Sequence, residues 1–430
     1  MTAEIAIMNK WGVALAADSA VSIVTSAGVK IYNTNKLFML SKFQPVGIMI
    51  YGNAELMGVP WEAIIKKYRK EELKQQSFKH LKDYGEHFLS YLNKNESLFP
   101  QQQQENNIYA TTQSYLDQTV NAHIKRAVEA FTHQGNKISD HEIQRIVSAV
   151  IKLSYERILE LERLKALPAD FERKVLRKYV KIFEQVIDLV FQKLPLSTVA
   201  YRQLKRICVS LFSRDTSRVG ASTSGIVIAG FGEEDLYPSL VSYEAECVVN
   251  DTLKYNDDRS TEITLESTAA LIPFAQQEMV VSFMAGISPD YRHILGEYLD
   301  TVFDKYPDEL IKEFPKMGAK KKTQLVTNLK QAGKAQLVEF WKKVEDWAQD
   351  NNVEKVLTAV SVLPKDELAS MAMSLVNLTS FRRRVTMDAE TVGGPIDVAV
   401  ISKGDGFVWI RRKHYFEHSD NPHFLTNYYR

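Results

Sequence analysis

The fold of this 430-residue chain is constrained most by two blocks of short β-type runs, which a long stretch with helical spacing separates. In each block, apolar runs of strand length alternate with turn residues, a pattern typical of antiparallel hairpins. The first block has runs at 4–8, 12–17, 36–40 and 46–51, and the second has runs at 225–231, 240–243, 248–249 and 262–265. A last hairpin is expected at 396–411. We therefore expect two antiparallel sheets.

Helical spacing of apolar residues covers most of the remaining chain. Helices are expected within 56–92, 109–211, 271–303, 307–348 and 364–384, and the polar, low-complexity segment 93–107 is expected to be a loop. The order is sheet, helices, sheet, helices, hairpin. That order favours an α+β fold, a four-layer α/β/β/α sandwich with enlarged helical layers. We expect a single domain over 1–430, with helical insertions at 93–215 and 300–362.

Composition excludes several classes of function. Lys plus Arg is 54 and Asp plus Glu is 53, so no overall field favours nucleic acid or an anionic membrane. The most apolar runs are too short to span a bilayer. Cys208 and Cys247 show no metal-ligand spacing and fit a reducing compartment. We expect a cytoplasmic protein with neither a nucleic-acid nor a membrane partner.

The start of the chain offers a candidate nucleophile. Removal of Met1 would give Thr2 a free α-amine, whose usual pKa is about 7.7–8.0, beside its own hydroxyl. Such an amine can act as the general base for that hydroxyl. A threonine in second position is common, so its weight depends on the residues that follow, such as Asp18 at the end of an apolar run. Taken singly, Asp18 fits a turn carboxylate and Lys36 a solvated charge at a strand edge.

The segment 12–19 resembles the start of proteasome β-type subunits, in which an N-terminal threonine precedes a strand that ends in a catalytic acid. Other segments resemble further parts of that family in the same order: 36–40, 50–54, 225–231, 286–291 and the Gly393-Gly394 strand at 392–401. They cover about half of the chain. Asp18 and Lys36 are about two residues further apart than is usual in the family, and Lys30 is the rival of Lys36.

The resemblance implies a role for each candidate residue. Thr2 would be the nucleophile, Lys36 would lie beside its hydroxyl, Asp18 would pair with Lys36, and the Gly52 amide would stabilise the oxyanion. Asp388 and Ser288 would support the amine, with Gly286 as the rival of Ser288. The chain departs from the family before Gly393, where Asp388 stands about one residue too far upstream and Val392 replaces a serine. Glu390 or Thr391 could substitute.

The function implied is a threonine-type N-terminal-nucleophile hydrolase, a peptidase that cleaves peptide or other amide bonds through an acyl-enzyme on Thr2 and needs no cofactor or metal. The alternatives are a non-catalytic scaffold or ring subunit and a small-molecule amidase or acylase on the same fold. The expected partners are a peptide or protein substrate, further copies of the chain in a homo-oligomer, and an ATP-dependent unfoldase. The tail residues His414, His418, Asp420 and His423 could ligate a metal, although a docked aromatic tail fits them better.

Overall fold

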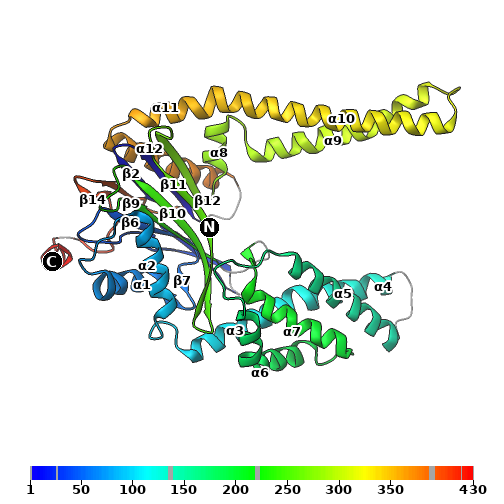
Figure 1. Ribbon diagram of the computed structural model, residues 1–430, viewed down its shortest axis with the longest axis horizontal. Helices are drawn as coiled ribbons and strands as arrows, with labels where there is room; N and C mark the ends of the chain where they lie inside the picture. The colour runs from blue at the N-terminus through cyan, green and yellow to red at the C-terminus, as the bar shows by residue number, and fades with distance from the viewer. Residues whose placement is uncertain are drawn as a thin grey trace. The chain divides into compact units, whose positions relative to one another are not determined.

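The computed structural model describes residues 2–25, 28–133, 139–217, 223–386, 393–417 and 419–429. The chain divides into two compact units. Unit 1 comprises Met1–Leu37, Leu236–Pro238 and Glu262–Arg430, and unit 2 comprises Phe38–Asp235 and Ser239–Thr261. Both units combine helices with antiparallel strand pairs, so the expected mixture of helices and antiparallel sheets is confirmed (Figure 1). The stacking of two sheets into four layers stays a prediction.

The strands are β1 (Ala3–Asn9), β2 (Gly12–Ala17), β3 (Ala20–Thr25), β4 (Gly28–Asn33), β5 (Leu37–Met39), β6 (Val46–Gly52), β7 (Glu55–Leu56), β8 (Val59–Pro60), β9 (Ser224–Gly230), β10 (Ser239–Val249), β11 (Thr252–Glu262), β12 (Ala269–Ala275), β13 (Asp397–Ser402) and β14 (Gly406–Arg411). The helices are α1 (Trp61–Lys67), α2 (Leu81–Lys94), α3 (Gln101–Tyr115), α4 (Ala122–His133), α5 (Asp140–Glu160), α6 (Phe171–Phe191), α7 (Thr198–Ser213), α8 (Glu278–Ala285), α9 (Pro289–Leu310), α10 (Ala319–Ala348), α11 (Glu354–Val362), α12 (Lys365–Val385) and α13 (Pro422–Tyr429).

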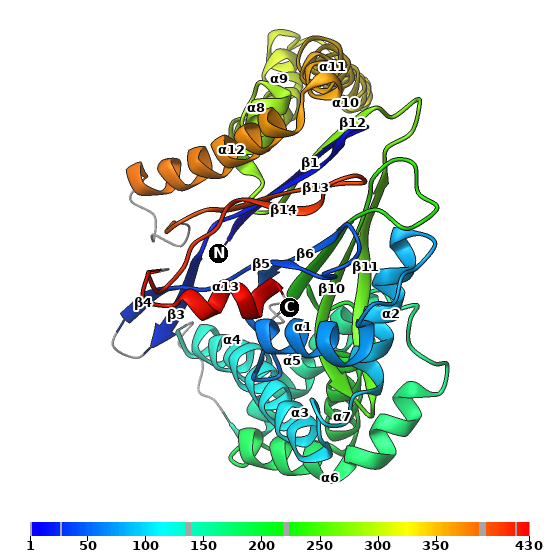
Figure 2. The ribbon, with the colours of Figure 1, turned by 90° about the vertical axis from the view of Figure 1, so that its left-hand side faces the viewer.

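Unit 1 is built on a five-stranded sheet with the order β12-β1-β2-β13-β14. Its central strands β1, β2 and β13 are buried along their whole length, which explains their nearly continuous apolar sequences. Figure 2 shows α12 running along one face of this sheet. Side chains project alternately from a strand, so Ile5 and Ile7 join the core beneath α12 while Glu4 projects from the opposite face.

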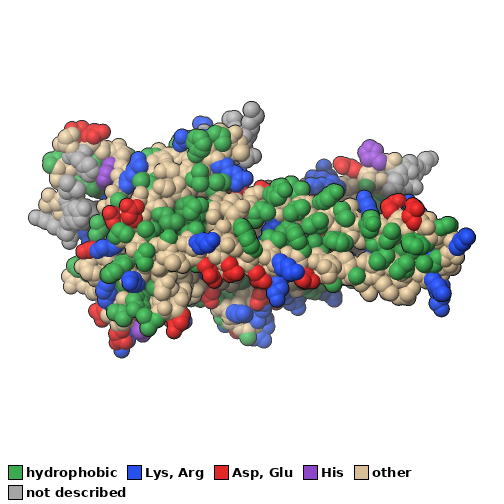
Figure 3. Space-filling model, turned by 90° about the horizontal axis from the view of Figure 1, so that it is seen from above, with side chains coloured by type: hydrophobic (Ala, Val, Ile, Leu, Met, Phe, Trp, Pro, Cys, Tyr) green, Lys and Arg blue, Asp and Glu red, His purple; other side chains and the backbone are tan. Residues whose placement is uncertain are grey.

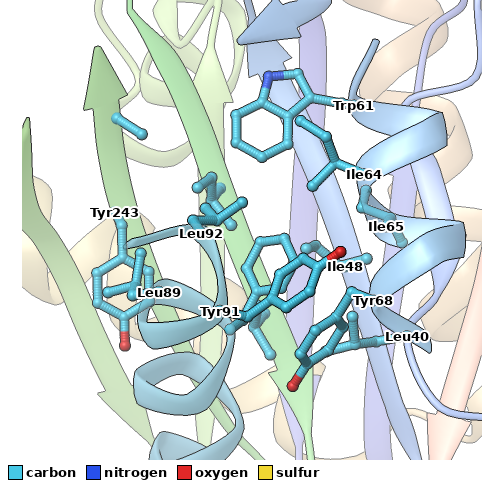
Figure 4. Close-up of a cluster of buried hydrophobic side chains, with 14 of the residues drawn as sticks. Leu40, Ile48, Trp61, Ile64, Ile65, Tyr68, Leu89, Tyr91, Leu92 and Tyr243 are labelled. Carbon is cyan, nitrogen blue, oxygen red and sulfur yellow. The ribbon is translucent and has the colours of Figure 1, made fainter. Parts of the chain in front are cut away.

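Unit 2 contains a second five-stranded sheet, with the order β11-β10-β9-β6-β5. Figure 4 shows part of its core, to which Trp61, Tyr68, Tyr91 and Ile48 of β6 belong, and in which Tyr68 lies beside Tyr91. The rings of Tyr68 and Tyr91 are 5.1 Å apart between centroids. A separate apolar cluster joins helices α3 to α7, so the long helical region of the sequence has a core of its own.

The helices α9 and α10 of unit 1 run side by side as a long arm (Figure 1). Lys330 of α10 forms ion pairs with Asp304 and Asp308 of α9, and Arg292 pairs with Glu345. Figure 3 shows hydrophobic side chains along this arm, and the exposed ones include Tyr291, Ile294, Tyr298, Val338 and Trp347. Among the described residues, no helix is both long and apolar enough to cross a membrane.

Several details of the expected secondary structure were wrong, among them the strand run at 262–265, of which only Glu262 lies in a strand, at the end of β11. The first β-block does not form one sheet, because β1 and β2 belong to one sheet and β5 and β6 to the other. Strands β3 and β4, which form a hairpin between Asp18 and Lys36, were not among the expected strand runs. The segment expected to be a loop at 93–107 contains the start of α3 at Gln101, and β12 lies where a helix was expected from 271 onward. A short apolar run such as β12 fits a strand and a buried helix equally well until its pairing with β1 is known.

Candidate functional site

Thr2 is buried directly before β1, with 3% of its surface exposed. Its carbonyl oxygen accepts a hydrogen bond from the backbone N–H of Gln276 at 3.1 Å, which fixes Thr2 beside the end of β12. The alternation along β1 directs Thr2 and Glu4 to the face opposite Ile5. The candidate nucleophile is therefore held by the sheet and is not on a loose end.

Asp18 follows β2 and is fully buried. Its Oδ1 accepts hydrogen bonds from Lys36 Nζ at 2.6 Å and from the Ala3 amide at 3.1 Å. Its Oδ2 accepts from the amides of Gly393 at 3.0 Å and Ala20 at 3.3 Å. Four donors around one carboxylate stabilise its charged form and leave it one orientation.

Lys36 is 4% exposed and places its ammonium between Asp18 and Thr2. Its Nζ donates to Asp18 Oδ1 at 2.6 Å, to the carbonyl oxygen of Ala20 at 2.7 Å and to Thr2 Oγ1 at 3.1 Å. An ammonium group has three N–H bonds, and these three contacts use all of them. Lys30, the rival candidate, lies in β4 and is exposed.

The segment at Gly393 binds the turn that carries Asp18. Besides the amide bond to Asp18, the Gly393 carbonyl accepts from the amides of Ser19 at 3.2 Å and Ala20 at 3.1 Å. The Ser19 hydroxyl donates to the Pro395 carbonyl. Gly394 has a φ of +76°, and a Cβ there would lie 2.5 Å from Asn33 Oδ1. The glycine at position 394 is thus explained by its positive φ and by the close approach of the Asn33 side chain.

Glu4 is a residue of this site that the sequence analysis missed. It is 2% exposed, and neither carboxyl oxygen has a hydrogen-bond partner among the described residues. Burial raises the pKa of its carboxyl well above the usual range, while the charge of Lys36 lowers it and that of Asp18 raises it. The available signal was an acidic residue inside an otherwise apolar strand, two positions after Thr2.

The other predicted site residues are placed as follows. The Ser288 hydroxyl caps α9 by accepting from the Tyr291 amide at 3.1 Å, and its rival Gly286 ends α8 with a φ of 75°. Gly52 ends β6 in unit 2, where its φ is +80° and a Cβ would lie 2.4 Å from the Thr223 carbonyl oxygen. Asp388, Glu390, Thr391 and Val392 lie outside the described residues. The catalytic roles of all these residues stay predictions.

A lysine in unit 2 has the same three kinds of hydrogen-bond acceptor as Lys36. Lys254, which is fully buried, donates from Nζ to Glu246 Oε2 at 2.5 Å, Thr216 Oγ1 at 2.6 Å and the Leu211 carbonyl oxygen at 2.8 Å. Both lysines thus bind one carboxylate, one threonine hydroxyl and one carbonyl. Thr216 is an internal residue and has no free amine. A lysine beside a threonine is therefore not by itself a sign of catalysis.

The described residues hold no group of three or more His, Cys, Asp or Glu side chains that could bind a metal ion. His418, one of the tail residues considered for that role, lies outside the described ranges. Cys208 and Cys247 are buried in the helical core of unit 2, and burial raises the pKa of Cys247 to about 12. The thiol of Cys247 is therefore unreactive at neutral pH.

No family model and no curated protein matches the chain. Among solved structures, an Anbu mutant from Hyphomicrobium sp. strain MC1 is 8% identical with a TM-score of 0.30, over 100% of this chain and 93% of that one. Anbu (ancestral beta-subunit) from Yersinia bercovieri is 10% identical with a TM-score of 0.28, over 99% of this chain and 94% of that one.

These comparisons contradict the assignment to the proteasome β-subunit family that the sequence suggested. Similarity at this level does not establish a common fold or family, and neither a family model nor a curated relative supports the assignment. The motifs that carried the resemblance are short strand ends with an Asp, a Lys or a Gly, and unrelated sheets produce such ends as well. The functional argument therefore rests on the geometry of the site.

Proposed function

We propose that this chain is a threonine-type N-terminal-nucleophile hydrolase that cleaves peptide or other amide bonds through an acyl-enzyme ester on Thr2 after removal of Met1. The observation that carries the proposal is the contact of Lys36 Nζ with Thr2 Oγ1 at 3.1 Å, made while Asp18 holds the same ammonium at 2.6 Å. At Thr2, unlike Thr216, removal of one residue supplies a base beside the hydroxyl.

The proposed reaction has two halves. The Thr2 hydroxyl passes its proton to the Thr2 amine while its oxygen attacks the carbonyl carbon of the substrate. The C–N bond then breaks, the amine returns the proton to the leaving nitrogen, and an ester remains on Thr2. A water molecule attacks that ester, the amine takes the proton of the water, and the Thr2 oxygen leaves with a proton as the acid is released.

Lys36 and Asp18 have electrostatic roles in this scheme. The ammonium of Lys36 stabilises negative charge as it develops on Thr2 Oγ1, and in a buried site this interaction is stronger than in water. Asp18 fixes the ammonium, since its carboxylate is itself held by three backbone amides. The charges are thus in place before substrate binds, so the protein does not have to reorient them during the reaction.

Covalent labelling with a β-lactone that acylates N-terminal threonine, followed by peptide mapping, tests the proposal. We expect label on Thr2 and a loss of labelling rate of about 10⁴-fold or more in Thr2→Ala. Thr2→Ser, which keeps a hydroxyl, should still be labelled. Thr216→Ala is the matched control, because Thr216 also contacts a buried lysine, and it should be labelled like the wild type. Label on another residue, or unchanged labelling of Thr2→Ala, would disprove the mechanism.

Mass spectrometry of the native N-terminus provides a second test. We expect Thr2 to be the first residue, since a retained Met1 would turn the amine into a peptide nitrogen that cannot accept a proton. A retained Met1 together with an unlabelled Thr2 would rule out the hydrolase and support the non-catalytic alternative.

A further inference from the structure

Glu4 is the one acidic residue of β1, and it projects from the same face of the strand as Thr2. Its neighbours in register are Ala17 of β2 and Phe274 of β12, so neither adjacent strand places a charged or polar side chain directly beside it. Its two carboxyl oxygens are buried and have no hydrogen-bond partner among the described residues. Burying a carboxyl without a hydrogen-bond partner costs free energy, most of all in its charged form. We take this cost as a sign that the site uses the Glu4 side chain.

Few charged groups share the surroundings of Glu4. Neither β2 nor β12 contains one, and the groups that act on its carboxyl are Lys36 and Asp18. Two strands away in the same sheet, Asp397 lies in register with Ala17 and forms an ion pair with Lys413. The α-amine of Thr2 joins these groups once Met1 is removed. Since Lys36 is already paired with Asp18, no side-chain cation among the described residues is left to pair with the carboxyl of Glu4.

The hydrogen bonds of Lys36 determine what a charged Glu4 would do. All three N–H bonds of the ammonium are used by Asp18, Ala20 and Thr2, so Lys36 could bind a Glu4 carboxylate only by giving up one of them. Without such a bond, the Glu4 carboxylate would add a second negative charge near one ammonium. That charge would oppose the negative charge that must form on Thr2 Oγ1 during acylation.

We propose that Glu4 is a positioning residue, which as the neutral acid leaves the charge of Lys36 available to the Thr2 oxygen and which inactivates the nucleophile when it loses its proton. The inference rests on the proposed function, because it concerns the same nucleophile. It assigns Glu4 a role in the charge balance of the site, without a contact to the substrate.

The dependence of the labelling rate on pH tests this role. The wild-type rate should rise as the Thr2 amine deprotonates and then fall as Glu4 ionises, which gives a bell-shaped profile. Glu4→Gln keeps the size of the side chain but cannot ionise. We therefore expect the ratio of its labelling rate to that of the wild type to increase with pH, by about tenfold or more once Glu4 is ionised in the wild type. A ratio that does not change with pH would overturn the inference.

Two further variants separate a charge effect from a packing effect. Glu4→Asp keeps an ionisable group and should retain the alkaline fall in rate. Glu244→Gln is the matched control: Glu244 lies in β10 of unit 2 and burial also raises its pKa, but it belongs to no part of the proposed site. Its profile should be that of the wild type. The proposed role would be contradicted if the fall of the labelling rate at alkaline pH disappeared in Glu244→Gln. It would also be contradicted if Glu4→Asp lost this fall as completely as Glu4→Gln.

Infrared spectroscopy of the full chain with isotope-labelled glutamate tests the charge state of Glu4 without any reaction. A carboxylic-acid band should be present at neutral pH in the wild type and in Thr2→Ala, should disappear on alkaline titration, and should be absent from Glu4→Gln. Its absence from the wild type at neutral pH would overturn the inference even if Glu4→Gln failed to fold. If the carboxylic-acid band is present in Thr2→Ala but the β-lactone does not label Thr2 of the wild type, the hydrolase proposal is refuted and the charge state of Glu4 is not.

Discussion

At the scale of single residues, the site contains two buried acids with opposite hydrogen bonding. Asp18 accepts from one ammonium and three backbone amides, whereas Glu4 has no partner among the described residues. Burial without a partner raises the pKa of the Glu4 carboxyl, which favours its neutral form. Two acids at one end of the same sheet thus have opposite surroundings.

Glu4 should make the stability of the fold depend on pH. In the unfolded chain its pKa is the ordinary value of about 4.3, and in the folded protein burial raises it well above that. Below the ordinary value both states are protonated. Above it the unfolded chain loses the proton first, so the contribution of Glu4 to the free energy of unfolding falls with rising pH until the raised pKa is passed.

Urea unfolding of wild type and Glu4→Gln across this pH range measures that contribution. The difference between the free energies of unfolding of Glu4→Gln and of the wild type should increase by about 1.4 kcal/mol per pH unit between the unfolded and the folded pKa of Glu4. Below the unfolded pKa this difference should not change with pH. A constant difference between the two proteins at all pH values would show that Glu4 has the same pKa folded and unfolded.

At the scale of elements, the site depends on a pairing that connects distant parts of the chain. Strand β2 is hydrogen-bonded to β1 on one side and to β13 on the other, and β13 follows the Gly393-Gly394 segment. The Gly393 segment forms hydrogen bonds with Asp18, Ser19 and Ala20, the turn that follows β2. The next residue, Gly394, has a backbone conformation that favours glycine.

Gly394→Ala should destabilise unit 1 and reduce labelling of Thr2. Its φ of +76° is unfavourable for alanine, and the new Cβ would lie 2.5 Å from Asn33 Oδ1, so we expect a loss of about 1–3 kcal/mol in the free energy of unfolding. Gly404→Ala, in the turn between β13 and β14, is the matched control because nothing lies within 4 Å of its Cβ position. Chemical denaturation of both variants makes the comparison, and equal stabilities would contradict the interpretation of Gly394.

The sequence predicts the local parts of this arrangement and misses the distant ones. The strands at 4–8 and 12–17 were expected from their apolar runs, and the structure places in contact Thr2, Asp18 and Lys36, which were selected by the resemblance. The division of the N-terminal strands between two sheets was missed because β2 pairs with β13 and β6 with β9, and no local pattern contains such pairings. Glu4 was missed because burial of a polar side chain depends on the neighbouring strands.

At the scale of the whole molecule, the two compact units contain ion pairs of the same design. Lys36 in unit 1 and Lys254 in unit 2 are both buried and both bind a carboxylate, a threonine hydroxyl and a carbonyl. The threonine is Thr2 in unit 1 and Thr216 in unit 2. The same three kinds of acceptor therefore hold a buried ammonium in both units.

Substitution of each lysine by methionine should distinguish the two lysines. Lys36→Met leaves the buried Asp18 carboxylate without its cation, and we expect it to lower the free energy of unfolding of unit 1 by about 3–5 kcal/mol. Lys254→Met leaves the partly buried Glu246 carboxylate without its cation and should destabilise unit 2 by less. Hydrogen exchange should become faster around β1 and β2 in Lys36→Met and around β10 and β11 in Lys254→Met. Labelling of Thr2 should be lost only in Lys36→Met. Loss of labelling in Lys254→Met, with unit 1 still protected from exchange, would contradict the assignment.

The hydrogen bond from Gly393 to Asp18 joins residues that are 375 positions apart, and this separation has a consequence for the order of events during synthesis. At about 5–20 residues per second, a ribosome needs roughly 20–75 s to proceed from one to the other. During that interval the nascent chain contains Asp18 but lacks the Gly393 amide and the strand that follows it. A growing chain therefore cannot complete the four hydrogen bonds around the Asp18 carboxylate until residue 393 has been added.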